Sequence, residues 1–557
     1  MAEFYYSHVF KELKRMSYKK CKDQTSKIET AESLRDDFHN FKFCTLIFYL
    51  SLVLLLAGAG AALADVKLPA VIGDNMVLQQ GGKISIWGWA DPGEEVMAGV
   101  SWHNMKWAVT ADKDGEWSFK MNPPKAGGPY EMTISGKNVI EIKNIMVGEV
   151  WVCSGQSNMQ WSVQSSANAE QEIAEAVYPK IRLFTVKRKV AETPQQDCEG
   201  SWTECSPETV PDFSAVAYFF GRELHKELNV PVGLIHTSWG GTPAEAWTRR
   251  EVLEANPDCA PILKRYDDAV AKYPQAMEEY EQKLAEWKQA VEKAKAEGKK
   301  PPRRPRAPFG PGNPHAPAGL YNAMIAPLIP YGIQGAIWYQ GESNAGRAYQ
   351  YRTLFPDMIK NWREDWGLGV FSFIFVQLAN FMEVKSEPGQ SAWAELREAQ
   401  LMTLALPKTG MAVIIDIGEA DNIHPKNKQD VGKRLALWAL ARTYGKKLVY
   451  YGPVYESMQV DGNRIVLYFD HVGGGLVARG NEQLKGFAIA GADREFVWAD
   501  ARIEGDKIVV SSEKVPEPVA VRYAWADNPV CNLYNKEGLP ATPFRTDDWP
   551  GVTVDAR

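Results

Sequence analysis

The sequence predicts an α/β protein whose parallel, doubly wound sheet is preceded and followed along the chain by β modules. Its 557 residues are 45% apolar and 24% charged, which is the composition of a globular protein with large cores. From 147 to 444, near-continuous apolar runs alternate with amphipathic stretches, as buried parallel strands alternate with helices. Before and after that region, short alternating runs separated by turn residues are typical of antiparallel strands.

Residues 1–64 predict a leader followed by a secretory signal. The run 44–64 carries no charge, Lys42 stands just before it, and it closes at 62–64 on the sequence ALA, an A-x-A cleavage pattern. The same run is long enough to span a bilayer, so an uncleaved anchor is the alternative. Because the leader is unusually long, Met16 is a candidate for the true start. In either case we expect an exported protein (periplasmic, extracellular or lumenal) with no other membrane contact.

Three modules follow the signal. Residues 65–146 predict an N-terminal β-sandwich, since the runs KISIWGWA, WAVTA and WSFKM are separated by turns such as DPGEE and DKDGE. Residues 147–444 form the predicted α/β domain, and 445–557 a C-terminal β-rich module. A segment at about 262–316 interrupts the α/β pattern: it is rich in Glu, Lys and Ala at helical spacing and then in Pro. We expect it to be a peripheral lid or spacer.

Composition limits the partners that we expect. The formal net charge of −6 gives no basic field, which argues against nucleic-acid binding. The 19 tryptophans fit carbohydrate contact as well as they fit sheet packing. No CxxC or HExxH pattern occurs, so no metal or other cofactor is expected. Cys198 and Cys205 could pair across a short loop, but the cysteines are too few for a disulfide scaffold. The sequence does not predict an oligomeric state.

Loops with candidate functional residues follow two predicted strands of the α/β domain, EVWVCS and VGLIHTS. Ser157 lies in the segment GQSNM, which comes directly after the strand EVWVCS, and a strand-to-helix turn there can expose its hydroxyl beside free backbone N–H groups. The alternative is that Ser157 only caps the next helix. Gly240 and Gly241 follow the strand VGLIHTS and could leave an N–H free for a ligand, although tight-turn glycines are also common for structural reasons.

Two later loops complete the candidate site. In WYQGESN, Gln340 or Asn344 could donate to an oxyanion, whereas we expect Glu342 to organise the loop by accepting hydrogen bonds; a polar turn with a buried Glu is the alternative. The loop DNIHP places Asp421 three residues before His424. A serine nucleophile needs a base, usually His, and that base needs a carboxylate to orient it. His424 is therefore the candidate base and Asp421 its candidate partner.

These four loops, in this order, resemble the blocks of the SGNH (GDSL-like) hydrolase superfamily, specifically its sialate O-acetylesterase family. The matching segments are GEVWVCSGQSNMQW, LIHTSWGGTPAEAW, LYNAMIAPLIPYGIQGAIWYQGESNA and DNIHPKNK. The resemblance implies a flavodoxin-like α/β core and metal-independent ester hydrolysis. It implies Ser157 as nucleophile, His424 as base, Asp421 as orienting partner and Gly240 or Gly241 in the oxyanion hole. GESN departs from the commoner G-x-N-D block, which leaves Gln340 and Asn344 as alternative donors.

The resemblance implies an O-acetylated carbohydrate as substrate, with 9-O-acetylated sialic acid first. An arginine would suit its carboxylate, and Arg347, Arg249 and Arg250 are candidates, each with an ion pair as the alternative. Trp161 and Trp239 could stack on a sugar face, and Glu342 is a further candidate for binding the substrate. Three alternatives stay open: an esterase for acetylated xylan or another hemicellulose, a lipase or thioesterase, and a non-catalytic carbohydrate-binding surface protein.

Overall fold

One long strand, β7 (Val139–Gly155), runs from the N-terminal β region into the α/β region. Its first part pairs antiparallel with β6 (Gly127–Ser135) and parallel with β1 (Val77–Gln79). Its second part pairs parallel with β10 (Val232–Ser238) and β11 (Gly335–Tyr339), and every residue from 145 to 155 is buried. The boundary that the sequence predicts at 146/147 therefore falls inside a continuous strand.

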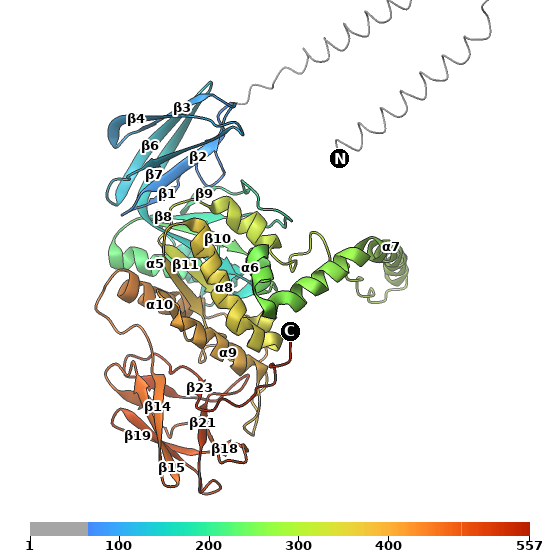
Figure 1. Cartoon of the computed structure of the whole chain (residues 1–557), viewed down its shortest axis with the longest axis vertical. Coiled ribbons are helices and arrows are strands. Elements are labelled where there is room, and N and C mark those ends of the chain that lie inside the picture. The colour runs from blue at the N-terminus through green and yellow to red at the C-terminus, as the bar shows by residue number, and fades with distance from the viewer. Residues whose placement is uncertain (1–64, 481) are drawn as a thin grey trace, which may run out of the picture. The chain divides into compact units, whose positions relative to one another are not determined.

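The computed structural model describes residues 65–480 and 482–557 (Figure 1). The predicted leader, signal and cleavage pattern lie outside these residues. Residues 66–557 form one unit, and none of its helices is both long and apolar enough to cross a membrane.

The N-terminal strands show the alternation that the sequence predicts. β2 (Ile84–Trp89) and β5 (Glu116–Met121) form an antiparallel pair with every second residue buried. β3 (Glu95–Val100) pairs with both β4 (His103–Thr110) and β6, which connects this layer to β7.

The central sheet is mostly parallel, as predicted, with strand order β13-β12-β11-β7-β10-β8-β9. Among the described strands of this order, β9 alone runs antiparallel to its neighbour within the order. The strands that follow β7 along the chain (β8, β9 and β10) lie on one side of it, and the next strands (β11, β12 and β13) lie on the other side. In such sheets the crevice outside the carboxyl ends of the strands at this reversal is the usual ligand site. The strands not yet given bounds are β8 (Tyr178–Thr185), β9 (Trp202–Cys205), β12 (Ser372–Val376) and β13 (Thr409–Ala412).

Helices follow the strands in two packed pairs, α5 with α10 and α8 with α9 (Figure 1). Side-chain caps fix where three of them begin: the oxygens of Ser214, Ser391 and Asn427 each accept a hydrogen bond from an N–H in the first turn. The helices are α3 (Ser157–Gln160), α4 (Ala169–Ala174), α5 (Ala215–Leu228), α6 (Arg250–Ala255), α8 (Ala348–Trp366), α9 (Ala392–Met402) and α10 (Lys428–Trp438).

The predicted helical excursion is α7 (Ala260–Ala296), which projects from the rest of the unit (Figure 1). Only Ile262 and Leu263, at its first turn, are buried. A Pro-rich loop then returns the chain to the α/β region, and this loop lines a cavity that is described below.

The C-terminal region has its own apolar core, centred on residues such as Ile465, Ile489 and Val521. Two four-stranded antiparallel sheets, β14-β15-β20-β19 and β18-β17-β21-β23, and the pair β16-β22 enclose it. These strands are β14 (Val454–Asp461), β15 (Arg464–Asp470), β16 (Leu476–Ala478), β17 (Phe487–Ala490), β18 (Val497–Trp498), β19 (Asp500–Glu504), β20 (Lys507–Ser511), β21 (Ala520–Tyr523), β22 (Leu533–Asn535) and β23 (Phe544–Arg545).

Cys198 and Cys205 both carry free thiols, so the disulfide that the sequence allows between them is absent.

Candidate active site

A cavity of about 470 Å³ opens where the loops after β7, β10 and β13 meet. Ser157, Gly240 and His424, one residue from each loop, line it together. These loops lie at the carboxyl edge of the sheet, where the strand order reverses around β7. The cavity therefore contains the nucleophile, oxyanion and base candidates from three distant parts of the sequence.

Ser157 begins α3 and does not cap it. The capping position belongs to Gln156, which makes no side-chain cap, and the Ser157 hydroxyl has no hydrogen-bond partner among the described residues. β7 ends in Gly155 at φ +143°, where a Cβ would lie only 2.1 Å from the carbonyl oxygen of Tyr339. Glycine is therefore required for β7 and β11 to deliver their loops to the same place.

Of the two candidate glycines, the structure places Gly240 against Ser157. A Cβ on Gly240 would lie 3.3 Å from the Ser157 Cβ. The Gly240 N–H donates to Oε1 of Gln160 at 2.8 Å, so an oxyanion at this place would take over that hydrogen bond. Gly241 lines a different cavity, and its carbonyl oxygen accepts from the Ser343 hydroxyl at 2.8 Å.

His424 is held by an aromatic stack. Its ring lies 5.1 Å from that of Trp161, at an interplanar angle of 19°. Burial, followed by the charge of Lys428, lowers the pKa of His424 below its ordinary value, so the imidazole is neutral at pH 7 and able to accept a proton. Trp161, a candidate for sugar stacking, thus packs on the imidazole of His424.

The structure does not bring Asp421 to His424. Asp421 is exposed, and within the described residues neither a hydrogen bond nor an ion pair joins its carboxylate to the imidazole. The loop is instead folded by the side chain of Asn422. Its Oδ1 accepts from the backbone N–H of His424 at 3.0 Å, and its Nδ2 donates to the carboxylate of Glu419 at 3.0 Å. Glu419 also accepts from the N–H of Lys426 at 2.8 Å.

The side chain of Asn158, the residue after Ser157, connects its own loop to the loop that contains Glu342 and to the loop that contains His424. Its Nδ2 donates to Oε1 of Glu342 at 2.6 Å and to the carbonyl oxygen of Ile423 at 3.0 Å. Its Oδ1 accepts from Nζ of Lys428 at 2.6 Å. Glu342 therefore organises its loop by accepting a hydrogen bond, as the sequence predicts, and it does not line the cavity of Ser157.

Two ionisable side chains, the acidic Glu342 and the basic Lys428, bond to the Asn158 amide. Burial raises the pKa of Glu342, whose Oε2 has no partner in the described structure, and burial lowers the pKa of Lys428 to about 7. The Lys428 ammonium also lies over the rings of Trp161 and Tyr339, at 5.8 and 5.4 Å from their centroids. The sequence does not single out Asn158 or Lys428, because a buried lysine leaves no pattern of its own.

Neither amide candidate of the third loop lines the Ser157 cavity. Nε2 of Gln340 donates to Oδ1 of Asn344 at 2.6 Å, and Oε1 of Gln340 accepts from the Tyr351 hydroxyl at 3.0 Å. Nδ2 of Asn344 donates to the buried carboxylate of Glu245 at 2.9 Å. Both amides are thus committed to a buried network that shapes the loop.

The arginines chosen from the sequence are in ion pairs outside the Ser157 cavity. Arg347 pairs with Glu245 at 2.6 Å, Arg249 with Asp365, and Arg250 with Glu254 at 2.8 Å.

Arg188, which follows β8 and belongs to no motif, is the arginine that lines the Ser157 cavity. It has no ion pair or hydrogen-bond partner in the described part of the chain. Its guanidinium stands 5.7 Å from the ring of Trp239, so this candidate sugar-stacking residue contacts a cation instead.

A second Ser–His pair lines the same cavity. The Ser238 hydroxyl lies 2.6 Å from Nε2 of His236. Burial, with a smaller effect from Arg188, lowers the pKa of His236 to about 4. Such a weakly basic imidazole is poorly matched to proton abstraction near pH 7, so His424 is the better base. No cluster of three or more metal-ligating side chains occurs in the described residues.

Known proteins resemble this chain over most of its length. The family described as carbohydrate esterase, sialic acid-specific acetylesterase, matches residues 147–300 and 314–441. Sialate O-acetylesterase from Rattus norvegicus is 31% identical over 89% of this chain and 97% of that protein. Sialate O-acetylesterase from Homo sapiens is 30% identical over 91% of this chain and 98% of that protein.

A solved structure extends the similarity to the fold. It is a carbohydrate acetylesterase from Xanthomonas citri, 37% identical, with a TM-score of 0.74, covering 87% of this chain and 100% of that one. The shared architecture is a mixed α/β fold with a mostly parallel central sheet and additional C-terminal β-sheets.

Removing the Asn158 amide is expected to separate the loops. Asn158→Ala leaves Glu342 and Lys428 buried without this partner, which costs about 1–3 kcal/mol of unfolding free energy. It also displaces Ser157 relative to His424, which lowers kcat for an acetyl ester about a hundredfold. Asn361→Ala is the matched control, because Asn361 is equally buried (1% exposed, as Asn158 is) but lies on α8 away from the cavity. Equal kcat losses in both variants, measured beside denaturant unfolding, would contradict the bridging role.

The pH profile is expected to report the charge of Lys428. The acid limb of kcat/KM follows the base of the free enzyme, so it lies below the ordinary His pKa. Lys428→Gln removes a positive charge that disfavours imidazolium, and the limb then moves to higher pH, while the new amide still donates to Asn158. Lys426→Gln removes an exposed charge of the same loop and leaves the limb in place. An unmoved limb in Lys428→Gln would show that this charge does not act on His424.

Proposed function

The chain belongs to the sialic acid-specific acetylesterase family of carbohydrate esterases, and from that premise we propose that it removes O-acetyl groups from carbohydrate by acyl transfer through Ser157. Its family makes it a carboxylic ester hydrolase. The observation that carries the proposal is the single cavity lined by Ser157, Gly240 and His424. A free hydroxyl, a neutral imidazole and a backbone donor beside the hydroxyl are the parts that ester attack needs.

The first step forms an acetyl-enzyme. His424 takes the proton from Ser157 as the hydroxyl oxygen attacks the acetyl carbonyl carbon. The N–H groups of Ser157 and Gly240 then donate to the oxyanion, with the amide oxygen of Gln160 giving up its place on Gly240. His424 passes the proton to the departing sugar oxygen. Water, deprotonated by the same imidazole, releases acetate in the second step.

The strand order supports the assignment to an SGNH-type, flavodoxin-like core. With β8 and β9 set aside as additions, β10-β7-β11-β12-β13 is the 2-1-3-4-5 order of flavodoxin-like sheets. In this arrangement the loops after β7, β10 and β13 supply Ser157, Gly240 and His424.

We propose 9-O-acetylated sialic acid as the preferred substrate, with the carboxylate held by Arg188. This guanidinium lines the reaction cavity, and an unpaired arginine is suited to a bidentate hydrogen bond with a carboxylate. The second candidate is a neutral acetylated hemicellulose such as acetyl xylan. The solved structure that is 37% identical is described as a carbohydrate acetylesterase, a description that covers acidic and neutral sugars alike.

Replacing the nucleophile is expected to abolish turnover. Ser157→Ala should lower the hydrolysis of p-nitrophenyl acetate by at least about a thousandfold, because the variant lacks the hydroxyl that attacks the ester. Circular dichroism and thermal unfolding check that the variant is folded. Ser238→Ala is measured in parallel. If that variant loses activity and Ser157→Ala keeps it, the nucleophile is Ser238 and the proposal fails.

Asp421 enters this mechanism as the carboxylate that orients His424, a role predicted from the sequence alone. It requires the exposed side chain to approach the imidazole. On that role, Asp421→Asn lowers kcat by about a hundredfold or more in the same assay. An unchanged kcat would leave a Ser157–His424 pair whose base is positioned by Trp161 and Asn422.

The substrate proposal is tested by Arg188. Wild-type protein is expected to release acetate with higher kcat/KM from 9-O-acetylated sialic acid than from acetylated xylo-oligosaccharides. Arg188→Gln should raise KM for the sialic acid about tenfold and leave the neutral substrate unchanged. Lys187→Gln is the matched control, since Lys187 is paired with Glu199 and does not line the cavity. A preference for the xylo-oligosaccharide, insensitive to Arg188, would assign the enzyme to hemicellulose.

A further inference from the structure

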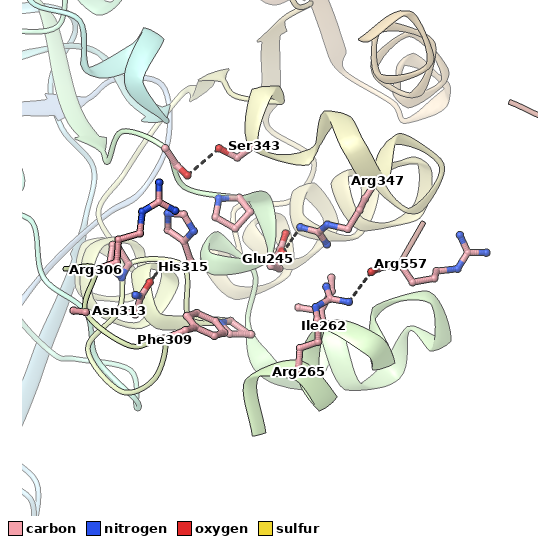
Figure 2. A pocket seen from close by; sticks show the side chains of 15 residues that line it. Glu245, Ile262, Arg265, Arg306, Phe309, Asn313, His315, Ser343, Arg347 and Arg557 are labelled. Carbon is pink, nitrogen blue, oxygen red and sulfur yellow. Dashed lines mark hydrogen bonds and ion pairs between the residues drawn. The ribbon is translucent and has the colours of Figure 1, made fainter. Parts of the chain in front are cut away.

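A second cavity, of about 1110 Å³, is lined by Gly241, whereas the preceding Gly240 lines the cavity of Ser157. Figure 2 shows the side chains that line this second cavity. Gly241 and Ser343, from two of the candidate active-site loops, form part of its wall. The Pro-rich loop after α7 supplies much of the remainder, including Arg306 and His315. The insertion and two of the candidate active-site loops therefore line the same cavity.

The lining of this cavity is strongly cationic. Of the described residues that line it, four are arginines and only Glu245 is a carboxylate. Glu245 is already neutralised, because Arg347 pairs with it at 2.6 Å and Asn344 donates to it at 2.9 Å. Arg265 donates to the main-chain oxygen of Arg557 at 2.6 Å, and the Arg557 guanidinium, which points away from the hollow in Figure 2, donates to the carbonyl oxygen of Val554 at 2.8 Å. Arg306 is therefore the lining arginine that keeps its guanidinium without a partner among the described residues. An anion entering this cavity would meet surplus positive charge.

Two donors in this cavity have no partner in the described protein. Arg306 is exposed and makes neither an ion pair nor a hydrogen bond. The ring of His315 is likewise unbonded, while its backbone N–H donates to Oδ1 of Asn313 at 2.9 Å and fixes the turn that carries it. Figure 2 shows both on the side of the hollow formed by the Pro-rich loop, opposite Arg347 and Arg265.

The cavity also offers an apolar surface. Phe309, from the same loop, is 37% exposed, and Pro243, Pro314 and Pro317 line the wall. Aromatic and proline faces suit the apolar face of a sugar ring, whereas an inorganic anion would gain nothing from them. Prolines also restrict the loop, which lowers the entropy lost when it binds a ligand.

The two cavities are close enough for one oligosaccharide. A Cβ on Gly241 would lie 4.0 Å from Nε2 of His315, and a Cβ on Gly240 would lie 3.3 Å from the Ser157 Cβ. Since Gly240 and Gly241 are one peptide unit apart, Nε2 of His315 lies within about 14 Å of the Ser157 Cβ. A sugar next to the acetylated one can span that distance.

We propose that this cavity is a second subsite that binds the carboxylate of an acidic sugar linked to the acetylated one, with Arg306 and His315 as its donors. The inference rests on the proposed function of Ser157 and extends it to the neighbouring sugar. The planar guanidinium of Arg306 matches a carboxylate, and Phe309 supports the ring. The carboxylate can belong to a uronic acid on an acetylated xylan or to a second sialic acid, and both present the same group.

The test compares acidic and neutralised substrates. Arg306→Gln, alone and with His315→Ala, is assayed on an acetylated glucuronoxylan oligosaccharide, on the same oligosaccharide with its carboxyl reduced to an alcohol, and on an O-acetylated disialyl oligosaccharide. KM is expected to rise about tenfold for at least one acidic substrate, with kcat unchanged and no effect on the reduced one. The acidic substrate that responds identifies the source of the carboxylate. Arg303→Gln, which removes the same charge from the same loop outside the cavity, is expected to match the wild type.

Two results would overturn the subsite: unchanged KM for both acidic substrates, or an equal rise for the carboxyl-reduced one. Failure of the proposed function would be recognised separately, as absence of wild-type turnover of p-nitrophenyl acetate. In that case calorimetric titration with non-acetylated glucuronoxylan and disialyl oligosaccharides decides the inference. Weaker binding of either by Arg306→Gln than by wild type supports the subsite, and equal binding of both refutes it.

Discussion

The site depends on one buried amide. The side chain of Asn158 bonds to Glu342 after β11, to the backbone at Ile423 after β13 and to Lys428 at the start of α10. Because Asn158 directly follows Ser157 and Ile423 directly precedes His424, the same amide fixes both reacting residues. Two of its partners are ionisable side chains, the half-buried Glu342 and the buried Lys428, so leaving either without a hydrogen bond carries a desolvation cost. The geometry of the site and the stability of its loops are therefore coupled.

The turn after β10 contributes to two cavities, each of which is also lined by an arginine without an ion-pair partner among the described residues. On one side Gly240 lies against Ser157, in a cavity that is also lined by Arg188. On the other side Gly241 borders the cationic cavity built with the Pro-rich loop. The insertion thus has a physical reason to be where it is, since it adds binding surface within reach of the nucleophile without entering the reaction cavity.

Much of the site could be predicted because buried parallel strands are continuous apolar runs and their loops must meet at one edge. Ser157, Gly240 and His424 follow from that rule. The oxyanion amides could not be chosen, because Gln340 and Asn344 look the same in sequence whether they face a ligand or each other. Arg188 carries no pattern, and it reaches the site only because β8 lies beside β10. The continuity of β7 was hidden for a similar reason, since a strand shared by two sheets has no break in composition. The Asp421–His424 spacing predicts a contact, but Asn422 folds the loop so that Asp421 is exposed.

The most direct test of the account is to identify the serine that becomes covalently labelled. A fluorophosphonate reacts with a serine only when a base activates it, and peptide mass spectrometry identifies the residue. The account predicts label on the peptide that contains Ser157, formed at least about a hundredfold more slowly in His424→Ala. Label on Ser238, or undiminished labelling of Ser157 without His424, would contradict it.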